Sequence, residues 1–173
     1  MRPGTLCGLR ASPDNRWLVR LDHHAGLNSI WIYDTRTWLL VRDLSFRSAG
    51  VDVTGAAIDP TSRFIVTGGV GDNSLRVWDL ITGRLVGQCN GNVLGWHPVW
   101  SPDGRTLAVR DTGSLRLWSM VIFRELAAFP VNREDPDFPL GFTPDGRSLV
   151  TFTLEHRVKV WSPPTLAEID LQP

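Results

Sequence analysis

Few residues of this 173-residue chain have the types and spacing that chemistry requires. The strongest candidates are the adjacent His23 and His24, which follow Asp22, because imidazole and carboxylate groups are common metal ligands. His156 beside Glu155 is a second group of this kind. A metal site needs additional ligands in a matching geometry, so solvated turn histidines are the simpler interpretation. We therefore expect no bound metal.

Motifs for nucleophilic or phosphate chemistry are missing from the sequence. It contains no G-x-S-x-G, no H-E-x-x-H and no G-x-x-x-x-G-K-[ST] segment. The glycine-rich run at 68–71 lacks the lysine and the strand-to-helix context that a phosphate loop needs. We therefore expect neither an enzyme activity nor a cofactor.

The charge balance excludes several classes of partner. The 18 basic and 18 acidic residues cancel, so the sequence shows no electrostatic footprint for nucleic acid or an anionic membrane. No apolar stretch approaches the length of a membrane span, and the first residues lack a signal-peptide core, so we expect a cytoplasmic protein.

Cys7 and Cys89 lack metal-ligand spacing and are expected to be reduced thiols. Lys159 is the only lysine among the 18 basic residues, and the others are arginines. This bias toward arginine indicates a GC-rich, bacterial genome.

The elements that must position these residues follow from a fourfold repeat. A proline-containing turn at 12–15, 59–62, 101–104 and 143–146 is each time followed by a hydrophobic segment with an aromatic residue near its end. The aromatic residues are Tyr33, Trp78, Trp118 and Trp161. The turn prolines are spaced by 47, 42 and 42 residues. A period of roughly 40–45 residues is typical of propeller blades with four strands each.

Each repeat divides into strands separated by Pro, Asp and Gly turn residues. The sequence predicts an all-β fold of four four-stranded antiparallel blades over approximately residues 5–44, 51–89, 93–130 and 138–171. In the third repeat the predicted strands are 93–100, 106–110, 114–118 and 125–129, and the last strand of the fourth is 166–171. No helical periodicity competes with this interpretation.

The segment at 75–79, Leu-Arg-Val-Trp-Asp, and the Ser-Pro-Asp-Gly turn at 101–104 resemble WD-repeat β-propellers. The resemblance covers nearly the whole chain. The stretch at 97–104 is also similar to TolB-type propeller repeats, which would change the family and leave the architecture alone.

The family resemblance implies a buried network of His, Asp, Ser/Thr and Trp in each blade. The positions of the histidine hold Ala49, Gly91 and Arg133 instead. The second repeat alone is predicted to keep the other three members, which are Asp72, Thr67 and Trp78. We therefore expect the blades to depend mainly on packing between sheets.

Four blades are fewer than the seven or so with which the resembled rings usually close. The chain is therefore an open arc within a larger ring, a unit that pairs with a second copy, or a tight four-bladed ring. An open arc exposes the apolar flanks of its end blades, so we expect self-association or docking to the remainder of a ring. Trp17, Trp31 and Trp38 are candidates for this association surface, and ordinary core between blades is the alternative interpretation.

The resemblance also implies a function. It indicates a non-catalytic interaction scaffold that presents one rim of the propeller to a peptide or protein partner. The alternative is the recognition segment of a larger multidomain signalling enzyme or sensor. The rim combines the turns between second and third strands with the connections between blades. Its charged and polar residues are His23, His24, Arg47, Asp72, Arg110, Asp111, Arg133, Glu134, Asp135, Glu155 and His156. Solvation alone would also explain a polar rim.

Overall fold

The structure is a computed structural model that describes residues 5–24, 27–44, 46–47, 52–70, 74–90 and 96–162. These residues form antiparallel strands in four sheets, which confirms the predicted all-β fold. The first sheet contains β1 (Thr5–Ala11), β2 (Trp17–His24), β3 (Leu27–Asp34) and β4 (Leu39–Asp43), with the short β5 (Phe46–Arg47) beside β3. The second contains β6 (Asp52–Ile58), β7 (Phe64–Val70), β8 (Ser74–Asp79) and β9 (Leu85–Asn90).

The third and fourth sheets repeat this order. The third contains β10 (Trp96–Trp100), β11 (Thr106–Arg110), β12 (Ser114–Ser119) and β13 (Arg124–Pro130). The fourth contains β14 (Phe138–Phe142), β15 (Leu149–Phe152) and β16 (Val158–Trp161). The strand predicted over 166–171 lies outside the described residues.

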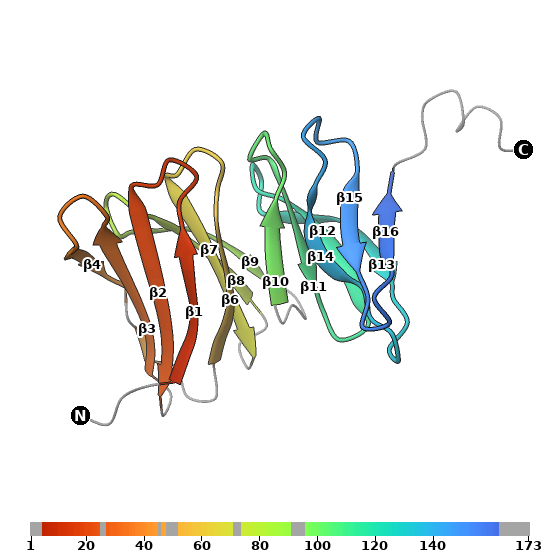
Figure 1. Cartoon of the computed structure of the whole chain (residues 1–173), viewed down its shortest axis with the longest axis horizontal. Helices are drawn as coiled ribbons and strands as arrows, with labels where there is room; N and C mark the ends of the chain where they lie inside the picture. Colours follow the sequence, from red (N-terminus) through yellow and green to blue (C-terminus); the bar gives the residue numbers. More distant parts are fainter. Residues whose placement is uncertain are drawn as a thin grey trace, which may run out of the picture.

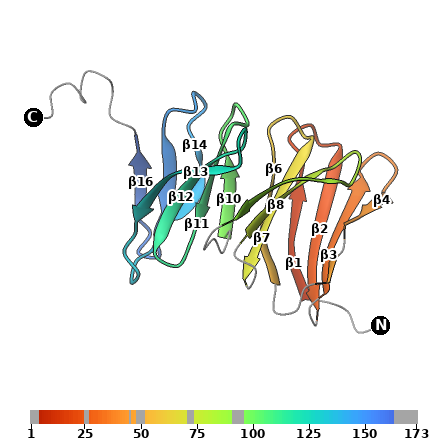
Figure 2. The same ribbon diagram turned by 180° about the vertical axis from the view of Figure 1, so that it is seen from behind.

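The sheets are arranged in an arc. In Figure 1 they lie side by side in chain order, from the first sheet in red and orange to the fourth in blue, and Figure 2 shows the same order from behind. The first strands of successive sheets contact one another, β1 with β6, β6 with β10, and β10 with β14. The described sheets do not close into a ring, because the first and fourth lie at opposite ends of the arc.

One hydrogen-bond pattern fixes the turn between the first two strands of a sheet. In the third sheet, the Ser101 hydroxyl donates to Asp103 Oδ1 over 2.5 Å and accepts the Thr106 amide at 2.9 Å. Asp103 Oδ1 also accepts the amide of Arg105 at 3.0 Å. The fourth turn residue, Gly104, has a φ of 70°, which glycine adopts without strain. The sequence Ser-Pro-Asp-Gly thus encodes a complete turn.

The other three turns are variations on this pattern. Ser12 with Asp14 and Thr143 with Asp145 repeat the hydroxyl-to-carboxylate bond. In the second sheet the roles are exchanged, since the Asp59 carboxylate comes first and accepts the amides of Thr61, Arg63 and Phe64. A carboxylate therefore organises every one of these turns, although its position in the motif changes.

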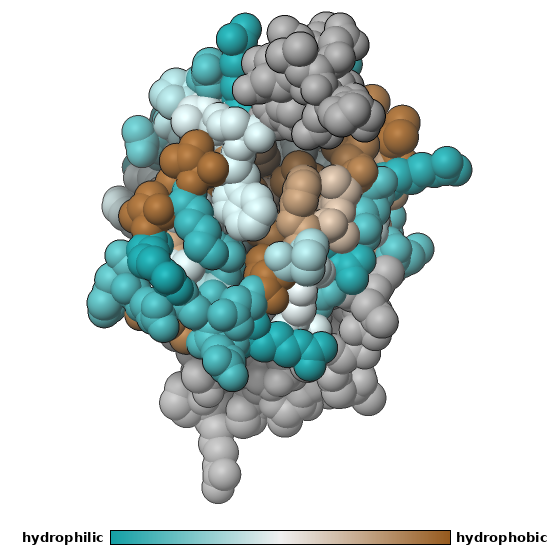
Figure 3. Space-filling model, turned by 90° about the vertical axis from the view of Figure 1, so that its right-hand side faces the viewer, coloured by the Kyte–Doolittle hydropathy of each residue, from teal (hydrophilic) through white to brown (hydrophobic). Residues whose placement is uncertain are grey.

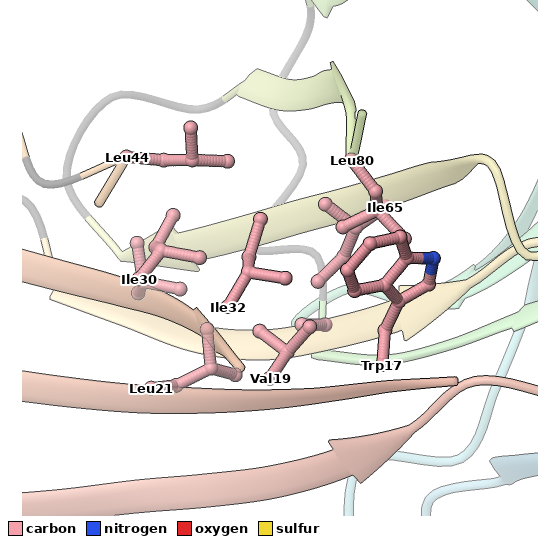
Figure 4. Packing of buried hydrophobic residues seen from close by; sticks show 10 residues of the cluster. Trp17, Val19, Leu21, Ile30, Ile32, Leu44, Ile65 and Leu80 are labelled. Atoms are coloured by element: carbon pink, nitrogen blue, oxygen red, sulfur yellow. The ribbon is translucent and has the colours of Figure 1, made fainter. Parts of the chain in front are cut away.

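The core lies in the seams between sheets. Side chains alternate between the two faces of a strand, so Trp17, Val19 and Leu21 all point from β2 toward the second sheet. There they meet Ile30 and Ile32 of the same sheet and Ile65 and Leu80 of the second, as Figure 4 shows. Similar clusters join the second sheet to the third and the third to the fourth.

This seam decides between the two interpretations of Trp17, association surface and core between blades. Its side chain is only 7% exposed and belongs to the core between the first and second sheets. Because the side-chain period of a strand is two residues, Trp17 and its neighbour Leu18 face opposite sides of the sheet. Trp17 is therefore a structural residue.

Candidate functional site

The predicted rim can be followed in the third and fourth sheets. Its described members lie at the end of β11 and on three loops, which are the β11–β12 turn, the β13–β14 connection and the β15–β16 turn. These members are Arg110, Asp111, Arg133, Glu134, Asp135, Glu155 and His156. Asp72 and the side chains of His23, His24 and Arg47 lie outside the described residues.

Asp135 ties two of these loops together. One of its carboxylate oxygens accepts the Glu155 amide at 3.1 Å and the other accepts Arg157 Nη2 at 2.5 Å. Burial acts to raise the pKa of Asp135, but the hydrogen bonds from Arg157 and Glu155 outweigh it and lower this pKa below its usual value. Asp135 is buried, so it supports the rim and does not offer its charge to a partner.

Asp111 has a comparable structural role. It is buried, and its carboxylate accepts the Thr112 amide at 2.7 Å and Arg116 Nε at 3.0 Å. Arg116 also reaches Glu125 Oε2 on β13 at 2.7 Å. Sequence reasoning placed Asp111 and Asp135 among the partner-binding charges, and the structure corrects this because both carboxylates are already paired within the chain.

The remaining rim charges point outward. Arg133, Glu134, Glu155 and His156 are exposed. Arg133 lies over the β11–β12 turn, since a Cβ added at Gly113 would lie 3.6 Å from Arg133 Nε. The β13–β14 connection thus contacts the turn of the third sheet through Arg133 and the turn of the fourth through Asp135.

An aromatic cluster stands beside these loops, and sequence reasoning missed it. The Arg110 guanidinium lies 4.4 Å from the centroid of the Phe138 ring, and His97 meets the same ring edge-on at 5.2 Å. Phe138 also stacks on Phe152 at 5.2 Å. Partial burial makes the largest contribution to lowering the pKa of His97, and the positive charges of Arg110 and Arg10 lower it further. No local motif signals this cluster, because its members come from four different strands.

The first strands of the sheets line a groove of about 540 Å³. It receives residues from β1, β6, β10 and β14, among them Arg10, Ala56, His97, Trp100 and Leu140. Two hydrogen bonds hold its floor, from Arg10 Nε to the Ala56 carbonyl at 2.9 Å and from Trp100 Nε1 to the Ala57 carbonyl at 3.1 Å. These bonds connect neighbouring sheets at their inner edge.

Hydrogen bonds of the predicted blade network are present in two sheets, and Asp72 of the second lies outside the described residues. In the second, Trp78 Nε1 donates to Thr67 Oγ1 at 3.0 Å. In the fourth, Trp161 Nε1 donates to Thr151 Oγ1 at 2.9 Å, and Thr151 donates to Asp137 Oδ1 at 2.9 Å. The prediction that only the second repeat keeps such a set was therefore wrong. It missed Asp137 because the carboxylate comes from the connection before the sheet and not from a turn within it.

Of the two remaining tryptophans proposed for association, Trp38 is the exposed one. Its side chain is 68% exposed at the β3–β4 turn, where its φ is 58°. Trp31 is half-buried beneath the Arg20 guanidinium, which lies 5.0 Å from the ring centroid.

Within the described ranges, no group of three or more His, Cys, Asp or Glu residues could hold a metal ion. Cys89 is a buried free thiol, and burial raises its pKa to about 11, so it stays protonated at neutral pH. A helix long and apolar enough to cross a membrane does not occur in the part of the chain that the structure describes.

Comparison with known families identifies the repeat. Residues 41–79 match the family model described as WD domain, G-beta repeat. The matched segment begins in β4 and ends with β8, so one sequence repeat spans the last strand of the first sheet and three strands of the second. The chain contains a WD40 repeat domain, and its four-stranded antiparallel sheets are typical of propeller blades, which confirms the predicted resemblance.

Proposed function

We propose that this chain is a non-catalytic interaction module that binds a peptide or protein with the rim formed by the three loops described above. WD40 domains are commonly protein-interaction scaffolds and are usually non-catalytic. The proposal that this rim is the binding surface of the chain rests on the geometry of the three loops.

The contact of the β13–β14 connection with two turns carries this proposal. Asp135 fixes it to the fourth sheet and Arg133 covers the turn of the third, so the three loops form one continuous surface. Beneath the surface, the buried carboxylates of Asp111 and Asp135 pair with Arg116 and Arg157 and accept backbone amides, which holds the loops in place. A surface that is ordered before binding loses less conformational entropy when a partner docks.

The exposed charges on this surface have both signs. Arg133 and Glu134 are adjacent on one loop, and on another Glu155 pairs with Arg157 at 2.8 Å beside the exposed His156. Complementary charges steer encounter and set specificity more than they add affinity. A polar peptide that carries both an acidic and a basic side chain fits such a surface best.

A peptide library displayed on phage and selected against the full chain tests the proposal. Selected peptides are expected to bind the chain in calorimetry and to lose about tenfold or more in affinity on combined Arg133→Ala, Glu134→Ala and His156→Ala substitution, equivalent to about 1.4 kcal/mol. Arg105→Ala with Arg147→Ala is the matched control, because these exposed arginines belong to the opposite turns. Peptides that respond only to the control substitutions would refute the assignment of the rim.

A further inference from the structure

Each of the first three sheets packs an aliphatic pair of its third strand against the next sheet. In the second sheet this pair is Leu75 and Val77, and both are buried in the cluster shared with the third sheet. Strand register makes Val158 and Val160 on β16 the equivalent pair in the fourth sheet. These two valines are 66% and 61% exposed. The outer face of the fourth sheet therefore has the composition of a buried seam.

The opposite face of the third strand packs against the preceding sheet. Trp78 packs on the cluster shared with the first sheet, and Trp118 lies in the cluster shared with the second. Tyr33 holds the same register position on β3, opposite Leu18, at the free end of the arc. Here the outer face of the first sheet forms a pocket of about 510 Å³ lined by Leu9, Leu18, Arg20, Tyr33 and Trp38.

Trp38 occupies the same position in its sheet as Phe123, which packs on the neighbouring second sheet. Trp38 and Phe123 each lie five residues after the strand aromatic and have φ values of 58° and 53°. Phe123 packs on the preceding sheet so closely that a Cβ added at Gly87 would lie 2.3 Å from its ring. The equivalent neighbour of Trp38 would be the outer edge of a sheet that precedes the first.

We propose that a second copy of this chain docks head to tail, with the outer face of its fourth sheet on the outer face of the first sheet. The valine pair of one copy would then cover Tyr33 and the pocket beside Trp38 on the other. The contact reproduces the three seams already present within the chain and is separate from the rim. It buries apolar surface at both ends of the arc.

Two observations favour a second copy as the occupant. The two faces are complementary and lie at opposite ends of one open arc, so copies supply each other's missing neighbour and need no other component. The chain has a formal net charge of zero, so copies do not repel one another. Figure 3 looks onto the fourth-sheet end and shows apolar groups, in brown and tan, across its middle between hydrophilic groups in teal.

Light scattering coupled to size exclusion of the full chain at micromolar concentration tests the contact. We expect a mass of two or more copies instead of the 19.3 kDa of one chain. Val160→Glu and Trp38→Glu should each raise the dissociation constant by about tenfold or more, because each places a charge in an apolar contact. Val121→Glu is the matched control, since this valine is 59% exposed on the β12–β13 turn, away from both outer faces. Circular dichroism checks that each variant keeps its β structure.

Mixing distinguishes head-to-tail docking from a contact between two identical faces. Each variant loses one face and keeps the other, so an equimolar mixture of the Trp38→Glu and Val160→Glu chains should form a two-chain complex that neither forms alone. If only one of the two variants dissociates, the contact is between identical faces and the proposal fails.

A wild-type chain that stays at 19.3 kDa on concentration would also overturn the proposal. This result would not contradict the proposed binding function of the rim, because peptide binding is measured separately and with other variants. Association that all three glutamate substitutions leave unchanged would place the contact elsewhere and refute the head-to-tail arrangement.

Discussion

The indole nitrogens of three equivalent tryptophans show how a single residue decides whether a blade completes its hydrogen bonds. Trp78 and Trp161 each donate to a threonine on the neighbouring strand, Thr67 and Thr151. Each threonine lies two residues after the residue that pairs with the tryptophan. In the third sheet the same register position is Val109, and among the described residues Trp118 Nε1 has no acceptor. Because a buried donor without a partner costs about 1–3 kcal/mol, this site is open to improvement.

We predict that Val109→Thr stabilises the chain by about 1 kcal/mol, because threonine has nearly the shape of valine and its hydroxyl would accept from Trp118. Urea unfolding followed by tryptophan fluorescence measures the change. The reverse substitutions provide the control, since Thr67→Val and Thr151→Val should destabilise the chain by a similar amount. A Val109→Thr chain that is less stable than the wild type would show that the desolvation of the hydroxyl exceeds the new bond.

At the scale of the element, a turn carboxylate links stability to pH. The hydrogen bond from the Ser101 hydroxyl makes the largest contribution to lowering the pKa of Asp103 below its ordinary value of 3.8, and the hydrogen bond from the Arg105 amide makes the next largest. The folded state therefore holds the ionised form more strongly than the unfolded state does. This contribution is present above pH 3.8 and is lost as the pH falls through the lower folded-state pKa.

Asp103→Asn tests this linkage, because asparagine keeps an acceptor in the turn but does not titrate. We expect the wild type to exceed the variant in unfolding free energy at pH 6 and to have a smaller advantage at pH 3, below the ordinary pKa of 3.8. Urea titrations at both pH values measure the difference. An advantage that stays constant with pH would mean that Asp103 has the same pKa in both states.

The seam between the second and third sheets depends on a missing side chain. The Phe123 ring occupies the space in which a Cβ of Gly87 would stand, with its nearest atom 2.3 Å away. Gly87→Ala should therefore destabilise the chain by about 1–3 kcal/mol through overpacking. Gly141→Ala is the control, since a Cβ there meets no atom within 4 Å and should change stability little.

The double variant Gly87→Ala with Phe123→Leu identifies the cause. If the ring is the obstacle, the double variant loses less stability than the two single effects add up to. Additive losses in thermal unfolding would mean that Gly87 acts through the backbone instead.

At the scale of the whole molecule, the arc behaves as a linear array in which each sheet is stabilised by its neighbours. The second and third sheets have a neighbour on both sides, whereas the first and fourth have one. In such arrays stability is approximately a sum of unit and neighbour terms. The end sheets should therefore open more easily than the middle ones.

Amide hydrogen exchange of the Val160→Glu chain, which is expected to be monomeric, tests this gradient. We expect amides of β7 and β11 to exchange about tenfold or more slowly than those of β2 and β15, because each missing seam lowers the local opening free energy. In the wild type at high concentration, protection of the end sheets should rise toward that of the middle. Equal protection of all four sheets in the monomer would show that the arc opens as one cooperative unit.

Local chemistry explains which features could be predicted. The turn at 101–104 and the aromatic spacing from Trp78 to Trp118 depend on residues close in sequence, so they indicated the strands and the repeated sheets directly. Asp137 and the cluster around Phe138 escaped prediction because their partners are on other strands. The sequence left both core and association surface open for Trp17, because composition alone does not tell which face of a strand is covered.

The class of fold and the number of repeats follow from the amino-acid sequence alone, because turn residues and alternating strands act over a few positions. Which charges are available to a partner depends on how the sheets and loops pack together. The tertiary structure buried Asp111 and Asp135 in ion pairs and left Arg133 and Glu134 in solvent, although all four look alike in the sequence. It also left Val158 and Val160 uncovered where their equivalents are buried, because burial depends on which sheet lies next and not on the strand itself.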